Sequence, residues 1–230
     1  MTDHSTTIAI IGGTGALGSA IARRLAKAGR SVVMGSREAA KAVAAAEAMS
    51  EALKAQGHTV NLRGAGNLAA AQEAGIILLA VPFASQEATL REIAGAAAGK
   101  ILIDTTVPLV PPKVMRVQLP AEGCAALRAQ ALLGEGVTVI SAFHNVAAHK
   151  LATDQAIECD VLVFGDQRAA REQVIGLVED CGLRGLHGGA LCNSAAAEAL
   201  TSVLIFLNRT YSVDGAGIRI TGDLKPPKAD

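Results

Sequence analysis

The chain has 230 residues, half of them apolar, and its 21 basic and 21 acidic side chains give a formal net charge of zero. This length and composition suit one domain with a large core, or one domain with a small appendage. With balanced charge and only 2% aromatic residues, the chain offers no basic stripe and no base-stacking platform, so nucleic acid is not expected as a partner. No cationic segment precedes an apolar one at the N-terminus, and the longest uncharged apolar stretch, Ile76 to Ala84, is too short to span a bilayer. These features predict a cytoplasmic protein without a membrane partner.

The cysteine and histidine positions argue against a disulfide framework and against a metal site. No two cysteines form a C-x-x-C pair, and without an export signal the thiols are expected to be reduced and buried in the core. The histidines and cysteines show no clustered spacing that would suit a metal ion, so we predict no metal. The residues concerned are Cys124, Cys159, Cys181, Cys192, His58, His144, His149 and His187.

Apolar runs that alternate with alanine-rich segments predict an α/β fold. Continuous apolar strands indicate a parallel sheet covered by helices on both faces. This Rossmann-like, doubly wound architecture binds ligands at the carboxyl ends of its strands, and we expect a mostly parallel sheet with a small C-terminal α/β extension. Strands are expected at about 8–11, 31–34, 58–62, 76–81, 101–103, 137–140 and 160–164, and helices at about 16–28, 38–56, 121–133, 167–181 and 195–207.

The first strand runs into glycines with the G-x-G-x-x-G spacing of a dinucleotide fingerprint. The first glycine of this pattern makes a tight turn, the second lets the backbone approach a pyrophosphate, and the third lets helix and strand pack closely. The helix that follows points its free N–H groups and positive dipole end at the phosphates. The alternative is a glycine-rich turn that binds nothing. The cofactor-binding residues expected here are Gly13, Thr14, Gly15, Ala16, Leu17 and Gly18.

The end of the second strand indicates which dinucleotide is bound. NAD-binding folds usually place a carboxylate there to accept hydrogen bonds from the ribose, whereas this chain has Gly35-Ser36-Arg37, with Lys41 one helical turn further. An arginine fork and a serine hydroxyl suit a 2′-phosphate. We therefore predict NADP(H), with Ser36, Arg37 and Lys41 as binding residues; the alternative is that Arg37 is only a solvated turn residue.

The fourth strand ends in Val81-Pro82, where this architecture places the nicotinamide. Proline fixes the backbone and removes a donor, so these residues predict an apolar wall for the ring. A plain exit from strand to loop is the alternative.

The sequence lacks the usual partners for hydride transfer to an organic substrate. The only tyrosine, Tyr211, is not followed by the lysine of a Tyr-x-x-x-Lys pair, and fewer than 90 residues follow His144, too few for the large helical domain of a β-hydroxyacid dehydrogenase. No Ser/His/Asp set or carboxylate pair is evident. An acceptor that itself stores electrons, such as a flavin-like ring, needs no strong protein acid or base.

Six stretches then carry a resemblance: GGTGALG at 12–18, GSR at 35–37, SAFHNVAA at 141–148, VFGD at 163–166, NS at 193–194 and DGAGI at 214–218. Together they resemble the NADPH-dependent coenzyme F420 reductases, in the right order over nearly the whole chain. The resemblance implies reversible hydride transfer between NADP(H) and the deazaflavin F420, with stacked rings, in a homodimer. It also implies an NADP-binding domain at 1–145 and an extension at 146–230 that completes the deazaflavin site, the two forming one compact unit.

The resemblance also assigns residues. Thr14, Ser36 and Arg37 match nucleotide-binding positions, and Lys41 stands where the family often has a basic residue. His144 and Val146 match positions beside the stacked rings, where they would position the ring without acting as acid or base. Ala148 lies in the same loop, and Gly215 and Gly217 match the segment that closes over the deazaflavin.

Three features of the assignment have alternatives or depart from the family. A structural role is the alternative for His144, and N-capping of the last helix is the alternative for Asn193 or Ser194. Ala147 departs from the family, which often has proline there, so this loop is expected to be more flexible.

Two other functions are compatible with the sequence. One is an NADPH-dependent flavin reductase, similar to the cytosolic domains of membrane ferric reductases. The other is an NADPH sensor without turnover, which would keep the glycine motif and Arg37 but would not need an open apolar cleft beside Val81 and Pro82.

Overall fold

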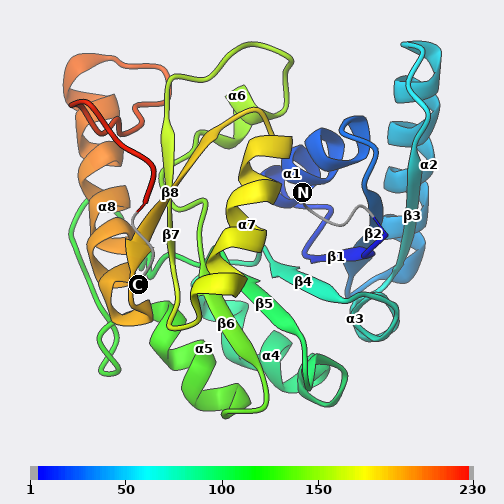
Figure 1. The fold of residues 1–230 in the computed structure, drawn as a ribbon, viewed down its shortest axis with the longest axis horizontal. Coiled ribbons are helices and arrows are strands. Elements are labelled where there is room, and N and C mark those ends of the chain that lie inside the picture. Colours follow the sequence, from blue (N-terminus) through cyan, green and yellow to red (C-terminus); the bar gives the residue numbers. More distant parts are fainter. Residues whose placement is uncertain (1–4, 228–230) are drawn as a thin grey trace.

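The computed structural model describes residues 5–227, which form one eight-stranded sheet with helices on both faces (Figure 1). The strand order is β3-β2-β1-β4-β5-β6-β7-β8, and all neighbours are parallel except β6 and β7. The predicted doubly wound, mostly parallel fold is therefore confirmed. The strands are β1 Ile8–Ile11, β2 Ser31–Ser36, β3 Asn61–Gly66, β4 Ile76–Leu79, β5 Ile101–Asp104, β6 Thr138–Ser141, β7 Asp160–Phe164 and β8 Arg184–Gly189.

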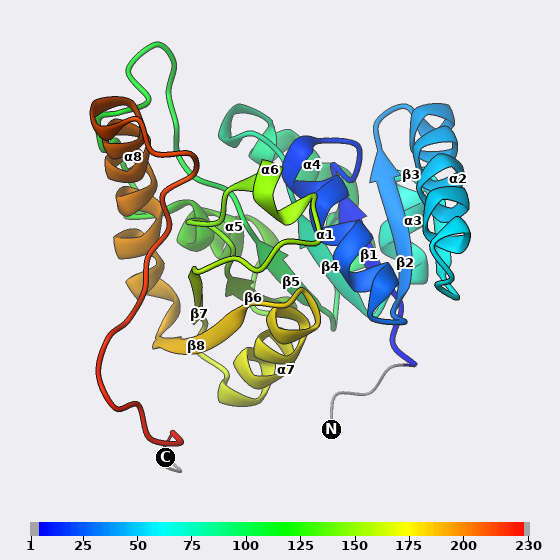
Figure 2. The ribbon, with the colours of Figure 1, turned by 90° about the horizontal axis from the view of Figure 1, so that it is seen from above.

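The helices divide between two apolar cores. Side chains of α1, α2, α6 and α7 belong to the core on one face of the sheet, and those of α3, α4 and α5 belong to the core on the other. Figure 2 shows α8 and α2 at opposite ends of the molecule. The helices are α1 Ala16–Lys27, α2 Ala39–Ala55, α3 Asn67–Glu73, α4 Phe83–Ala97, α5 Ala125–Leu133, α6 Ala148–Leu151, α7 Arg168–Asp180 and α8 Ser194–Tyr211, with a 3-10 turn η1 at Leu191–Asn193.

Glycine-containing strands account for the main differences from the predicted elements. The third strand begins and ends later than expected because it includes Gly64, where a Cβ would lie 2.2 Å from the Ala42 backbone of α2. Strand β8 was not predicted at all, since its three glycines have low strand propensity. At Gly188, a Cβ would lie 2.3 Å from the Phe164 ring, so the close approach of β7 requires glycine. Helices α3 and α4, which follow β3 and β4, were also absent from the predicted elements.

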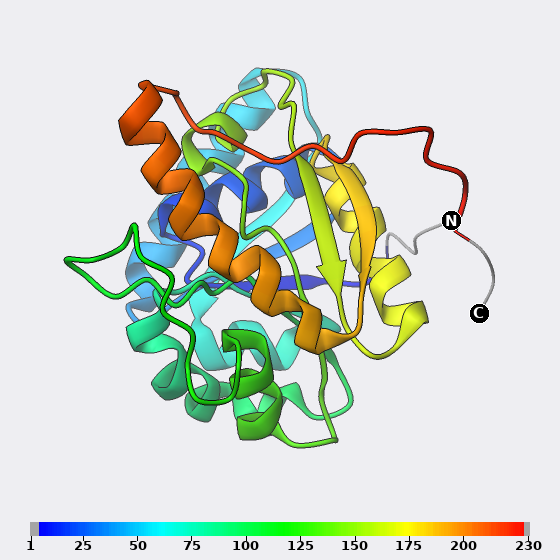
Figure 3. The ribbon, with the colours of Figure 1, turned by 90° about the vertical axis from the view of Figure 1, so that its left-hand side faces the viewer.

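Helix α8 buries three polar side chains and exposes two large apolar ones. Ser194, Glu198 and Ser202 are buried, whereas Val203 and Phe206 are 41% and 50% exposed. By length and composition alone, the stretch Leu191–Tyr211 could cross a membrane, and only a third of its most apolar part is buried in the fold. This stretch is not an uncharged apolar run in the sequence, because Glu198 and Arg209 interrupt it. Figure 3 shows α8 lying across one end of the molecule.

All four cysteines are free thiols in the structure. Cys124, Cys159 and Cys181 are buried, as expected for core thiols, and burial raises the pKa of each. Cys192 is exposed, which contradicts the prediction for this thiol, because η1 turns its side chain outward ahead of α8.

Candidate functional site

The glycine fingerprint lies at the carboxyl end of β1, where the strand order reverses between β1 and β4. A turn closes when the Gly15 N–H donates to the Gly12 carbonyl at 2.9 Å, and α1 begins directly afterwards. Among residues 5–227, no side chain caps this helix, and its first turn holds no acidic residue. The N–H groups of the first turn are therefore available to an anion.

Each glycine of the turn has a distinct steric requirement. Gly12, one residue before the expected pattern, has a φ of +79° and lies against the Ala80 carbonyl. A Cβ at Gly13 would lie 2.8 Å from the Ile10 carbonyl, and one at Gly18 would lie 2.5 Å from the Gly12 carbonyl. At Gly15 the nearest atom is 3.3 Å away. The turn therefore allows no side chain between helix and strand, while Gly15 remains open on the ligand side.

A cavity of about 190 Å³ opens beside this turn. Asn67 is a new component, because its buried Oδ1 accepts no hydrogen bond from any described residue and can receive one from a ligand hydroxyl. Helix α4 contributes Ser85 and Thr89. These polar residues lie far apart in the sequence and carry no motif, so only the fold reveals them. The predicted residues in the lining are Thr14, Gly15, Ser36, Arg37, Val81 and Pro82, and the others are Gly12, Asn67, Ala80, Ser85 and Thr89.

The basic residues predicted to bind the 2′-phosphate lie in different environments. Arg37 lines the cavity and is exposed. Lys41 lies outside the lining, and its Nζ donates to Glu38 at 2.7 Å. Glu38 is the residue after Arg37 and brings a carboxylate close to it; the ion pair with Lys41 offsets the charge of that carboxylate. Arg37 is the basic side chain of this segment that lines the cavity.

A second cavity, of about 200 Å³, is formed by the loop after β6, the outer end of α8 and the segment 215–216. Of the residues predicted for the deazaflavin, His144, Val146 and Gly215 line it. Ala148 and Gly217 do not: Ala148 begins α6, and a Cβ at Gly217 would lie 2.8 Å from the Cys159 sulfur. The residues that the sequence did not indicate are Asn145, Ala147, His149, Thr201, Leu204, Ile205, Asn208 and Ala216.

His144 is held rigidly at the edge of the second cavity. Its Nε2 lies 2.8 Å from the Ser141 hydroxyl, and its carbonyl accepts a hydrogen bond from Thr201. Burial lowers the pKa of His144 to about 3, so the ring is neutral. Phe143 precedes it with a φ of +66°. A non-glycine residue in this region is strained, and such strain is typical of functional segments.

The carboxyl groups of Glu198 in α8 and Asp104 in β5 are both buried. Burial raises the pKa of Glu198 to about 7 and that of Asp104 to about 6. Glu198 accepts hydrogen bonds from the N–H groups of Ala125 and Ala126 at the start of α5, and from the Ser194 hydroxyl. Neither suggested cap for α8 is realised, since Ser194 bonds inward and Asn193 donates to the Gly188 carbonyl.

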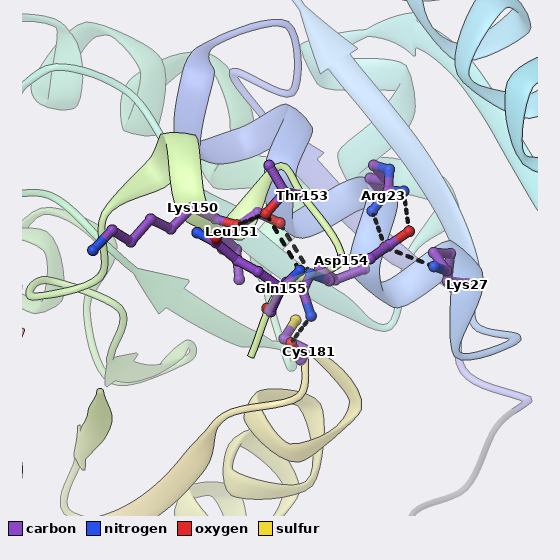
Figure 4. A network of polar contacts seen from close by, with 9 residues as sticks. Arg23, Lys27, Lys150, Leu151, Thr153, Asp154, Gln155 and Cys181 are labelled. Atoms are coloured by element: carbon purple, nitrogen blue, oxygen red, sulfur yellow. Dashed lines mark hydrogen bonds and ion pairs between the residues drawn. The ribbon is translucent and has the colours of Figure 1, made fainter. Parts of the chain in front are cut away.

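The loop that carries His144 continues into residues 151–155, which form hydrogen bonds and ion pairs with helix α1 (Figure 4). Asp154 accepts hydrogen bonds from both Arg23 and Lys27 at 2.7 Å, and these contacts hold its pKa well below the usual range. Arg24 donates to the carbonyls of Leu151, Gln155 and Cys181. The helix of the glycine fingerprint and the loop of the second cavity are therefore joined by three basic side chains of α1.

The fold and the first cavity define a class of protein. A doubly wound sheet with an uncapped, glycine-lined helix N-terminus at its switch point is the arrangement of a dinucleotide-binding protein. Within residues 5–227, no group of three His, Cys, Asp or Glu side chains could hold a metal ion.

The comparisons with known proteins then identify the family. The family described as NADP oxidoreductase coenzyme F420-dependent matches residues 7–108. An F420-dependent NADP reductase of Methanothermobacter marburgensis is 40% identical over 93% of this chain and 97% of its own. The corresponding protein of Methanocaldococcus jannaschii is 37% identical over the same shares. A crystal structure of a candidate F420-dependent NADP-reductase from Arthrobacter sp. FB24 superposes with a TM-score of 0.79 at 25% identity, covering 95% of this chain and all of that one. The chain belongs to the family of coenzyme F420-dependent NADP oxidoreductases, which confirms the resemblance.

Proposed function

We propose that the protein transfers a hydride reversibly between NADP(H) and coenzyme F420. The observation that carries this is the family membership over nearly the whole chain, together with a cavity at the fingerprint turn that suits a phosphorylated nucleotide. NADP(H) supplies or takes the hydride when bound, and F420 is the second substrate.

At the first cavity, the residues 13–18 bind the pyrophosphate through backbone N–H groups at the start of α1. Arg37 and Ser36 bind the 2′-phosphate, and Lys41 keeps Glu38 from repelling it. Val81 and Pro82 give the nicotinamide an apolar wall that excludes water from the reacting face.

At the second cavity, we assign His144 and Val146 to positioning the deazaflavin, with Gly215 in the closing segment. The neutral state of His144 suits a hydrogen bond to a ring and is unsuited to acid catalysis at neutral pH. Ala148 and Gly217 support this segment from outside the lining. In this assignment residues 1–145 bind NADP and residues 146–230 complete the deazaflavin site.

One assay tests the function against its two alternatives. Purified protein is mixed with NADPH and oxidised F420, FMN or FAD, and the NADPH absorbance is followed. Turnover with F420 alone supports the proposal, whereas turnover with FMN or FAD would make the protein a flavin reductase. Tight NADPH binding without turnover on any acceptor would instead indicate a sensor.

We also propose that the protein is a cytoplasmic homodimer, with the outer face of α8 as the interface. This face exposes Val203 and Phe206, while Ser194, Glu198 and Ser202 of the same helix are buried, so apolar area remains for a partner. The resemblance to dimeric reductases favours a second copy of this chain. Light scattering should give a dimer for the native protein and a monomer for Phe206→Ser. Flotation of the protein with vesicles would instead indicate a membrane as the occupant of this face.

A further inference from the structure

A chain of buried hydrogen bonds connects His144 to Glu198. His144 Nε2 lies 2.8 Å from the Ser141 hydroxyl, which lies 2.5 Å from the Ser194 hydroxyl, which donates to Glu198 at 2.8 Å. Ser141 and Ser194 are fully buried, and Glu198 is 1% exposed. Of the four hydrogen-bonded residues His144, Ser141, Ser194 and Glu198, only His144 lines the second cavity.

The charge of Glu198 decides which partner donates in each of these three hydrogen bonds. An ionised carboxylate only accepts, so Ser194 must donate to it. Ser194 then accepts from the Ser141 hydroxyl, and Ser141 has no second proton to give. The Ser141 oxygen must therefore accept a hydrogen from Nε2 of the neutral His144 ring. This leaves Nδ1, which no described residue contacts through a hydrogen bond, as an acceptor.

We propose that Glu198, acting through Ser194 and Ser141, sets which ring nitrogen of His144 carries the proton. It is a positioning residue, since it does not itself line either cavity. The ionised state places the proton on Nε2 and presents a bare Nδ1.

When Glu198 is neutral, the donor and the acceptor exchange roles in all three hydrogen bonds. Its own O–H then donates to Ser194, Ser194 donates to Ser141, and Ser141 donates to Nε2, so the proton moves to Nδ1. The pKa of Glu198 is about 7, raised mainly by burial and further by the Asp104 carboxyl of β5. The other titratable groups that face it are Cys124 at the start of α5 and His144. Because the pKa of His144 is about 3, the ring itself stays neutral while Glu198 titrates.

The tautomer matters for what the second cavity binds. A bare Nδ1 suits an N–H or O–H donor of a heterocyclic ring, whereas Nδ1–H suits an acceptor. The effect on F420 affinity rests on the proposed function, but the tautomer is a property of the protein without ligand. The two can therefore fail separately.

Nitrogen-15 NMR of the histidine rings in the ligand-free protein is the test, with His144→Gln used to assign the signals. At pH 8.5 the wild type should show a protonated Nε2 and an unprotonated Nδ1 at His144. At pH 5.5 the two resonances should exchange roles. A proton on Nδ1 at pH 8.5, or one tautomer throughout this pH range, would overturn the proposal without any variant being needed.

Glu198→Gln sharpens the test because it is isosteric. The Ala125 N–H bond, at 2.7 Å, is shorter than the Ala126 N–H bond to the other oxygen, at 3.2 Å, so the glutamine oxygen should keep the Ala125 bond. The amide NH₂ then turns toward Ser194, and the Ala126 bond is lost. The variant should therefore show Nδ1–H at every pH, and Ser194→Ala should show a mixture that does not respond to pH. Glu172→Gln, at an exposed ion pair of α7, should match the wild type. If F420 is the ligand, Glu198→Gln should weaken its binding roughly tenfold or more at pH 8.5. A wild-type tautomer in Glu198→Gln would refute the proposal.

Discussion

The two cavities are built from different parts of the chain. The first is shaped mainly by backbone: a glycine turn, an uncapped helix start and the ends of four parallel strands. The second is shaped by side chains, with His144 held by Ser141, Thr201 and, through Ser194, by Glu198. A backbone site depends on the absence of side chains, whereas a side-chain site depends on protonation and on distant residues.

This difference suits the two ligands that we propose. Phosphates are bound by fixed N–H groups and a dipole that do not change with pH. A ring that must be aligned for hydride transfer needs a hydrogen bond of defined direction. The arginine and lysine contacts join α1, which follows the glycine turn, to the segment around Asp154, which follows the loop of the second cavity.

Gly18→Ala should have the largest effect, because it adds a Cβ 2.5 Å from the Gly12 carbonyl. Overpacking against a backbone atom costs on the order of 1–3 kcal/mol, and displacement of the turn should weaken NADPH binding roughly a hundredfold. Gly95→Ala is the control, since Gly95 lies in α4 and no described atom outside its own helix backbone lies within 4 Å of its Cβ position. It should stabilise the protein by about 0.5–1 kcal/mol. Urea unfolding followed by circular dichroism, and calorimetric titration with NADPH, measure both effects. Equal behaviour of the two variants would contradict the backbone origin of the first site.

The titratable groups of the second site should make the free energy of unfolding depend on pH. The pKa of Glu198 is raised from 4.5 to about 7 on folding, so its stabilising contribution is complete below pH 4.5 and is lost as the pH rises through 7. The full loss is on the order of 3 kcal/mol. The lowered pKa of His144 acts in the opposite sense: its contribution is present above pH 6.5 and is lost as the pH falls toward 3.

Two variants separate these contributions. Relative to the wild type, Glu198→Gln should become more stable as the pH rises from 4.5 to 8, whereas His144→Gln should become more stable as the pH falls from 6.5 to 4. Asp104, whose pKa is about 6, contributes a slope of the same sign as Glu198 in the wild type and in both variants. Parallel pH profiles for the two variants would show that neither group titrates as proposed.

Arg37→Ala tests the charged part of the first site. Loss of a charged hydrogen bond of about 1.5–3 kcal/mol should weaken NADPH binding roughly ten- to hundredfold, and NADH binding should barely change. Lys41→Ala is the matched comparison, because Lys41 pairs with Glu38 and lies outside the cavity lining. We expect a smaller loss there, from the uncovered Glu38 carboxylate. Equal losses for NADPH and NADH in Arg37→Ala would exclude this arginine as the 2′-phosphate ligand.

The backbone origin of the first site and the side-chain origin of the second also determine how much of each could be predicted from the sequence. The fold class and the first site follow from local patterns, since the glycine turn and Gly35-Ser36-Arg37 are contiguous and each has a steric or charge reason. Asn67 and Thr89 reach the first cavity only because α3 and α4 follow β3 and β4 around the sheet. Helix α8 contributes Thr201 to the second cavity from more than fifty residues away, and no local pattern marks it.

Strand β8 and the network of Glu198 were missed for related reasons. The strand contains three glycines whose reasons lie in the fold: Gly185 packs against Ile175, Gly188 against the Phe164 ring, and Gly189 has a φ of +89°. Glu198 appears in the sequence as an isolated charge in an apolar helix. Its significance depends on Ser141, which meets Ser194 across a separation of 53 residues.

The smallest effect is expected at Ala147, where the family often has proline. The structure gives Ala147 a φ of −71°, which proline adopts without strain, and its N–H donates to no other described residue. Ala147→Pro should therefore stabilise the protein by about 0.4–1 kcal/mol by restricting the unfolded chain, and F420 affinity should be retained. Ala152→Pro is the matched control: its φ of −68° is equally suitable, but its N–H donates to the Ala148 carbonyl at 3.0 Å. Thermal unfolding should shift upward for the first variant and downward for the second, since only the second loses a hydrogen bond. A downward shift for Ala147→Pro would mean that this loop needs the freedom that alanine gives it.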